Sequence, residues 1–145
     1  MVSKSKVYFF FQGVRLTLKN RTALKGIIGK IFRKEKRTLE SINYVFCSDK
    51  SLLEINRKYL KHDFYTDIIT FDLSEKEKII ADVYISVDRV KDNASSLDVS
   101  FRSELHRVIF HGALHLCGYG DKTESQKLKM RDREDYYINL YFKRK

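Results

Sequence analysis

The sequence predicts an α+β fold: a single domain over residues 1–145, with about five helices packed on a small mixed β-sheet of about four strands. Short β-branched runs alternate irregularly with longer segments of helical periodicity, a pattern typical of this class. The length of 145 residues suits one domain with one sizeable core. No repeat, low-complexity tract or linker divides the chain, and proline is absent.

Four elements are expected in the first part of the chain: a strand over residues 6–11, a helix over 21–36, a strand over 41–47 and a helix over 49–60. Both strand segments are rich in aromatic and β-branched residues. Apolar residues recur on one face of the first helical segment, and Asn20 precedes it as an N-cap. Asp49 is expected to cap the second helix, which is short.

Five elements are expected in the rest of the chain: strands over residues 66–71 and 79–87, and helices over 88–97, 100–117 and 123–141. The two strands are β-branched runs that are expected to lie side by side. Gly118 follows the longer middle helix at the position where glycine commonly ends a helix. Thr123 and Gln126 have the spacing of a capping box at the start of the last helix.

The charge of the chain indicates a polyanionic partner. Its formal net charge is +10 and its isoelectric point is near 9.6, which makes nucleic acid the first candidate and an anionic membrane surface the second. Nine basic residues lie between Arg15 and Arg37, against one acid, Glu35. Within this stretch we expect Arg33, Lys34 and Arg37 to contact the phosphates of a nucleic acid. A solvated helix face is the alternative interpretation of the same charge run.

Nothing in the sequence indicates a membrane or secreted protein. The apolar run at residues 7–11 is too short for a signal peptide, and no small-residue cleavage site follows it. No segment approaches the roughly 20 apolar residues of a transmembrane helix. Cys47 and Cys117 are the only cysteines, so no disulfide framework is expected. We therefore expect a cytoplasmic protein without a membrane partner.

His111 and His115 are the first candidates for a metal site. They stand four residues apart in one predicted helix, so both point to one face, about 5–6 Å apart at Cβ. This separation allows two imidazoles to bind one ion. Glu104 and Val108 extend the same face toward the start of the helix, whereas His106 points away from it. Two hydrogen-bonded histidines without a metal are the alternative interpretation.

Asp121 is expected to complete this metal site, because a reversal of the chain at residues 118–120 lets it approach the histidine pair. Two histidines, one carboxylate and a water in the open position are the arrangement of a catalytic zinc ion, which lowers the pKa of that water to about 7. His111, His115 and Asp121 are therefore the predicted ligands of one Zn²⁺. Gly112 stands where HExxH proteases carry a glutamate base, which disfavours peptide hydrolysis by that route.

The stretch HGALHLCGYGD, residues 111–121, resembles the H-G-x-L-H-L-x-G-Y-D-H signature of the YbeY family of bacterial metal-dependent endoribonucleases and ribosomal RNA maturation factors. The third metal ligand of that family is the last histidine of the signature, and Asp121 takes its place here. The histidine spacing followed by Gly-x-x-Asp is also similar to metzincin-like proteases. We therefore expect a metzincin-like arrangement of the metal-binding helix.

A second stretch, NRKYLKHDFYTDIITF at residues 56–71, is similar to the N-x-x-Y-R-x-K-D-x-P-T-D-V-L-S-F motif of the same family. Leu60 replaces the arginine of that motif, and Tyr65 replaces its proline. Lys61 and His62 are the cations nearest to the replaced arginine, and they are the candidates for a catalytic role near a scissile phosphate. A solvated loop is the alternative interpretation of both residues.

The resemblance implies a zinc-dependent, single-strand-specific endoribonuclease that acts in small-subunit ribosomal RNA 3′ end maturation and in ribosome quality control. The implied partners are ribosomal RNA, the small ribosomal subunit and ribosomal proteins. One alternative is a non-catalytic assembly factor with a structural zinc, which the loss of arginine at Leu60 favours. A metal-dependent peptidase is another, which Gly112 disfavours. No general base is identified from the sequence, and the oligomeric state stays open.

Overall fold

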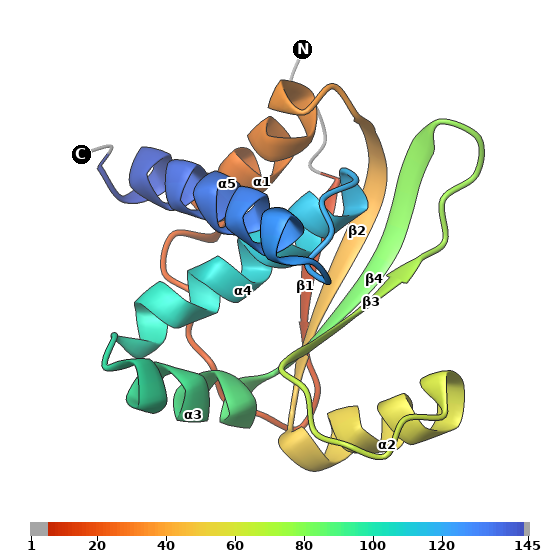
Figure 1. Cartoon of the computed structure of the whole chain (residues 1–145), viewed down its shortest axis with the longest axis vertical. Coiled ribbons are helices and arrows are strands. Elements are labelled where there is room, and N and C mark those ends of the chain that lie inside the picture. Colours follow the sequence, from red (N-terminus) through yellow and green to blue (C-terminus); the bar gives the residue numbers. More distant parts are fainter. Residues whose placement is uncertain (1–5, 144–145) are drawn as a thin grey trace.

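The computed structural model describes residues 6–143, and all nine expected elements are present in it. The strands are β1 (Val7–Phe11), β2 (Thr38–Cys47), β3 (Ile68–Asp72) and β4 (Lys78–Ser86). The helices are α1 (Arg21–Lys34), α2 (Asp49–Leu60), α3 (Val87–Leu97), α4 (Phe101–Leu116) and α5 (Glu124–Phe142). The predicted α+β class, with five helices and a four-stranded mixed sheet, is confirmed (Figure 1). No helix within the described residues is long and apolar enough to cross a lipid bilayer.

The four strands form one sheet in the order β1-β2-β4-β3. β1, β2 and β4 run parallel, and β3 pairs antiparallel with β4. The two β-branched runs that were expected to be neighbours are therefore neighbours. Because β3 lies at an edge of the sheet, the residues that precede it are available to a site at that edge.

The helix boundaries follow the predicted caps, with one correction. Asn20 caps α1, and Thr123 with Gln126 forms the complete capping box of α5. The N-cap of α2 is Ser48 and not Asp49. Both residue types cap helices well, so the sequence leaves the choice to the geometry of the chain that enters the helix. Asp49 is instead the first helical residue, and its carboxylate accepts a hydrogen bond of 2.7 Å from an arginine of α3.

Helices α1 and α4 cover one face of the sheet, α5 packs on both of these helices, and α2 lies against one end of the other face (Figure 1). The main core lies between the sheet and these three helices. Its largest fully buried side chains include Phe32, Tyr44, Phe46, Phe110 and Tyr137. A smaller apolar cluster under α2 consists of Cys47, Leu52 and Ile69.

Helix α4 comes very close to the sheet at Gly112. A Cβ atom at this position would lie 3.0 Å from Ile68 Cδ1 and 3.2 Å from Val83 Cγ1, which is tighter than most contacts in folded proteins. Glycine therefore lets α4 rest on β3 and β4 without a shift of these side chains. The close approach also holds the flanking residues His111 and His115 beside the edge of the sheet.

Candidate functional site

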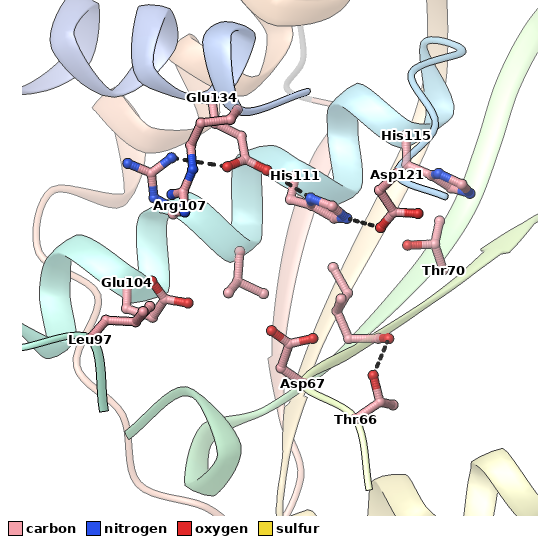
Figure 2. Close-up of a pocket in the computed structure, with 13 residues that line it drawn as sticks. Thr66, Asp67, Thr70, Leu97, Glu104, Arg107, His111, His115, Asp121 and Glu134 are labelled. Carbon is pink, nitrogen blue, oxygen red and sulfur yellow. Dashed lines mark hydrogen bonds and ion pairs between the residues drawn. The ribbon is translucent and has the colours of Figure 1, made fainter. Parts of the chain in front are cut away.

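The three predicted metal ligands line one pocket, a cavity of about 380 Å³ bounded by α4, α5 and the start of β3. His111 and His115 come from α4, and Asp121 comes from the loop between α4 and α5 (Figure 2). The polar lining of the pocket consists of Thr66, Asp67, Thr70, Glu104, Arg107, His111, His115, Asp121, Arg131 and Glu134. The expected helix face is also confirmed, because Glu104 and Val108 line the same pocket.

His111 lies between two carboxylates. Its Nδ1 is 2.7 Å from Glu134 Oε2, and its Nε2 is 3.3 Å from Asp121 Oδ2 (Figure 2). Burial lowers the pKa of His111, but the hydrogen bond and charge of Glu134, together with the charges of Asp121 and Asp67, outweigh burial and raise this pKa above its usual value. A neutral His111 donates a hydrogen bond from its Nδ1 proton to Glu134. Its Nε2, which faces Asp121, then carries a lone pair that can bind a metal ion.

His115 is oriented by the backbone of the reversal that follows α4. Its Nδ1 lies 3.2 Å from the carbonyl oxygen of Tyr119. Because a carbonyl oxygen only accepts hydrogen bonds, the neutral ring carries its proton on Nδ1. Nε2 is again the unprotonated nitrogen that can bind a metal ion. In both histidines Nδ1 therefore has a partner that orients the ring, and Nε2 is the nitrogen left for a metal.

Two imidazole nitrogens and one carboxylate are ligands that zinc accepts, and the distance between His111 and Asp121 also fits a zinc site. Two ligand atoms that each lie about 2.0–2.2 Å from a tetrahedral zinc ion are about 3.3–3.6 Å apart. The observed separation of His111 Nε2 and Asp121 Oδ2, 3.3 Å, matches this value. Nowhere in residues 6–143 are three His, Cys, Asp or Glu side chains already gathered around one point. The structure thus shows one ligand-like pair, with His115 as a third donor on the wall of the same pocket.

Glu134 was missed by the sequence reasoning, although it is the immediate partner of His111. It comes from α5, is buried, and also accepts a hydrogen bond of 2.9 Å from Arg107 Nη1. The buried residues of α5 are Met130, Glu134 and Tyr137, which recur at helical spacing. A glutamate within an apolar stripe is the signal that could have identified it, because a buried carboxylate needs partners.

Two further carboxylates line the pocket. Asp67 precedes β3 and accepts a hydrogen bond of 3.1 Å from Asn93 Nδ2, while Glu104 lies in the first turn of α4. Burial raises the pKa of both groups, and the charge of Asp67 adds to the rise at Glu104. Each carboxyl group therefore keeps its proton to a higher pH than an exposed one.

The other predicted site residues lie outside this pocket. Lys61 and His62 lie in the exposed loop that follows α2, where the His62 ring stacks on Phe64. The cations that line the pocket are instead Arg107 and Arg131. Arg107 is held by Glu134 and by Asp135, whereas the exposed Arg131 reaches the pocket from α5.

The three basic residues predicted to contact nucleic acid do not all lie on the same surface. Arg33 and Arg37 line a second cavity of about 710 Å³, together with Lys6 and Lys25. No acidic residue is among the described residues that line it. Lys34 lies apart from this cavity, with its ammonium group 5.6 Å from the centre of the Tyr136 ring.

Glu35, the one acid in the basic stretch, joins α1 to the segment that carries Asp121. Its carboxylate accepts hydrogen bonds from Tyr119 Oη at 2.7 Å and from Tyr137 Oη at 2.6 Å. Arg37 lies next to this contact and donates to the carbonyl of Cys117 at 3.0 Å. The two residues fix the chain on either side of Gly118, whose φ of 105° makes the reversal.

Comparisons with known proteins identify the family of the chain. The family model described as endoribonuclease YbeY matches residues 14–141. The endoribonuclease YbeY of Cytophaga hutchinsonii is 46% identical over 140 residues, which cover 96% of this chain and 98% of the relative. That of Flavobacterium psychrophilum is 43% identical over 124 residues, which cover 86% and 89%.

A solution structure of a Thermotoga maritima protein has the same fold, with a TM-score of 0.65 at 24% sequence identity. The match covers 94% of this chain and 89% of that one. The resemblance inferred from the two sequence motifs is thereby confirmed over most of the chain. This chain belongs to the YbeY endoribonuclease family.

Proposed function

We propose that the protein is a metal-dependent endoribonuclease that cuts single-stranded ribosomal RNA, with one zinc ion held by His111, His115 and Asp121. The observation that supports this proposal is that all three donor residues line one pocket, where His111 Nε2 and Asp121 Oδ2 are 3.3 Å apart and Glu134 lies behind His111. A zinc ion bound there would supply a Lewis acid for a phosphoryl oxygen and an activated water in its open position.

The residues of the chain supply orientation, charge and proton transfer. Glu134 and the Tyr119 carbonyl keep the protons of the two histidines on Nδ1 and their rings in place. Arg131 reaches the pocket as a cation for the phosphate that undergoes cleavage. Glu104 and Asp67 line the same pocket, and because burial raises the pKa of both, they are the proposed groups that give or take a proton.

The basic residues Arg33, Lys34 and Arg37 are proposed to contact the RNA backbone outside the pocket. Arg33 and Arg37 line a cavity with two lysines, which makes a concentration of positive charge suited to phosphates. Such contacts give an affinity that falls steeply with salt and depends little on sequence. Lys61 and His62 remain proposed catalytic candidates only if the exposed loop moves toward the pocket when RNA binds.

Small-subunit ribosomal RNA, at its 3′ end, is the proposed substrate, and the proposed setting is the cytoplasm. The small subunit and its proteins are the proposed partners, and ribosome quality control is the proposed wider role. A non-catalytic assembly factor with a structural zinc is the second candidate, because Leu60 stands where the family motif has an arginine.

The deciding experiment compares purified wild type with His115→Ala. Zinc content, cleavage of a labelled single-stranded RNA and cleavage of a peptide pool are measured for both proteins. We expect the wild type to hold about one zinc and cut the RNA alone, and the variant to lose both properties. RNA cleavage by both proteins alike would indicate a contaminant and reject the enzyme. Zinc bound without RNA cleavage would favour the assembly factor, and equal zinc in Asp121→Ala would remove Asp121 from the site.

A further inference from the structure

We propose that the end of α2 and the loop that follows it form a base-stacking surface for single-stranded RNA beside the pocket. This surface, called the aromatic loop below, comprises residues 59–65, of which Tyr59 and Leu60 are the last residues of α2. The inference rests on the proposed function, because it assumes that RNA is the substrate. It adds the side chains that would hold the unpaired bases next to the site of cleavage.

The aromatic loop exposes three large rings within seven residues. Tyr59, Phe64 and Tyr65 expose 60%, 55% and 53% of their surfaces. Such a concentration of exposed aromatic surface on a soluble protein typically marks a binding site. Each ring offers a flat face on which a nucleic-acid base of any sequence can stack.

Each ring is supported from one side by a neighbouring group. The His62 ring lies 5.1 Å from that of Phe64 at an interplanar angle of 21°, and the Arg89 guanidinium lies 5.1 Å from the centre of the Tyr65 ring. Lys58 Nζ is 5.3 Å from the centre of the Tyr59 ring. Because each ring has a neighbour on one side while half or more of the residue's surface is exposed, a base can complete the stack from the solvent side.

The backbone of the aromatic loop is fixed by hydrogen bonds. The buried Asn56 donates from Nδ2 to the carbonyl of Phe64 at 2.8 Å and accepts at its own carbonyl from His62 N at 3.1 Å. Arg57 and Asp63 form an ion pair across the loop. The backbone that carries the rings is therefore held in place before a ligand arrives, which lowers the entropic cost of binding.

The charge and position of the aromatic loop favour RNA over a protein partner. Lys58 and Lys61 alternate with the rings, and lysine is depleted at the centres of protein interfaces. Aromatic rings interleaved with cations are instead the pattern of single-strand binding surfaces. The chain runs directly from Tyr65 into Thr66 and Asp67, which line the pocket, so a strand stacked on the loop leads into the site.

The two departures from the family motif fall in this same loop. Leu60 removes the charged fork that an arginine would offer to a phosphate, and Tyr65 places a ring where the motif has a proline. This chain therefore has less charge and more stacking surface at the same place. The expected consequence is that the loop contributes to RNA affinity mainly through bases and less through phosphates.

The test measures the affinity of the whole protein for a labelled 2′-O-methyl RNA of 12 nucleotides, in buffer with EDTA, so that binding is separated from cleavage. The variant Phe64→Ala/Tyr65→Ala removes both rings, and Phe64→Tyr/Tyr65→Phe keeps both. Phe10→Ala is the matched control, because Phe10 is 50% exposed on β1. Thermal melting verifies that every variant is folded, and the same RNA as a duplex is the second ligand.

We expect the double alanine variant to bind the single strand roughly tenfold or more weakly, with an unchanged dependence on salt, because stacking is worth about 1–3 kcal/mol per base. Its weaker duplex affinity should be unchanged, because paired bases are not free to stack. The ring-keeping variant and Phe10→Ala should bind like wild type. Lys58→Ala/Lys61→Ala should instead reduce the slope of log affinity against log salt by about 1.4.

Wild-type affinity of the folded double alanine variant for the single strand would reject the aromatic loop as an RNA surface, which is also the result if the loop docks a protein. Equal losses for single strand and duplex, or an equal loss in Phe10→Ala, would reject it too. If the wild type itself does not bind single-stranded RNA, the proposed function fails together with the inference.

Discussion

Helix α4 carries two partly or fully buried histidines, five residues apart, in opposite environments. His106 is enclosed by aromatic rings, with Tyr141 stacked at 5.5 Å, and its Nδ1 contacts the carbonyl of Arg102 at 2.7 Å. Burial and, to a smaller extent, the charge of Arg102 lower the pKa of His106. The contact with the Arg102 carbonyl raises this pKa but does not outweigh them, so the pKa is lowered. His111 is also largely buried, but Glu134 and Asp121 raise its pKa.

The difference teaches that burial alone does not decide what a histidine does. Among rings, an imidazole stays neutral and serves as packing. Between carboxylates, it has a fixed proton on one nitrogen and a free donor atom on the other, which is what a metal ligand needs. The carboxylates come from α5 and from the loop before it, so the site is made by tertiary contacts of α4.

Replacing each histidine in turn should give the largest difference in zinc binding between the two positions. We expect His111→Ala to reduce zinc affinity by roughly a hundredfold or more and to abolish RNA cleavage, because a ligand is lost. His106→Phe should retain zinc and cleavage, with a loss of stability under about 1.5 kcal/mol, because the ring volume is kept. Zinc titration and thermal melting measure both effects. Loss of zinc in His106→Phe with the fold intact would contradict the assignment.

Replacing the carboxylate behind His111 should have the next largest effect. Glu134→Gln weakens the acceptor for the His111 proton, so we expect a 10–100-fold loss of zinc affinity, roughly the range for such partners. Asp135→Asn is the matched control, because Asp135 is the other carboxylate that binds Arg107, at 2.8 Å. This control should leave zinc affinity unchanged. Equal losses in the two variants would show that Arg107, and not His111, transmits the effect.

The support of His115 should be weaker, because it passes through a backbone carbonyl. Tyr119→Phe removes the hydrogen bond to Glu35, and we expect zinc affinity to fall by less than about tenfold as the Tyr119 carbonyl loses its fixed position. Tyr137→Phe is the control: it removes the other tyrosine hydrogen bond to Glu35, at a similar cost in stability of about 1 kcal/mol. Only the first should change zinc affinity. The same change in both would reduce Glu35 to a general stabilising role.

The pH dependence of unfolding should have opposite signs for the two histidines in the metal-free protein. The pKa of His106 is lower folded than unfolded, so the unfolded state binds more protons and stability falls as pH drops below about 6.5. The pKa of His111 is raised, so its contribution is complete below about 6.5 and is lost as pH rises through the folded value. Urea unfolding from pH 5 to 8 measures both. His106→Phe should remove only the acidic loss, and His111→Gln only the loss at higher pH.

The three proposed ligand residues could be predicted to share one pocket because they are local. His111, His115 and Asp121 lie within one helical turn and one reversal, and periodicity with Gly118 is enough to bring them to the same pocket. Glu134 could not be predicted, because its relation to His111 depends on how α5 crosses α4. For the same reason the sequence did not show Asp67 in the pocket, since the order of strands in the sheet places it there.

The nine helices and strands could be predicted from patterns of apolar residues. The residues at which they begin and end were harder to predict. Ser48 and Asp49 are both capping residues, and the choice between them depends on the path of the chain. Lys61 and His62 were expected near the chemistry because of their sequence position beside Leu60. The structure places them in an exposed loop, and the cations that reach the pocket, Arg107 and Arg131, come from α4 and α5.

The contact at Gly112 restricts which chemistries this scaffold can acquire. A protease of the HExxH type needs a glutamate after the first histidine, but here even one added carbon would meet Ile68 and Val83 at 3.0–3.2 Å. A glutamate at this position would require those side chains, or the helix, to shift by a few tenths of an ångström. The packing at Gly112 therefore disfavours the HExxH peptidase route independently of any question of substrate, and the acids that line the pocket come from other elements, such as α5 and the start of β3.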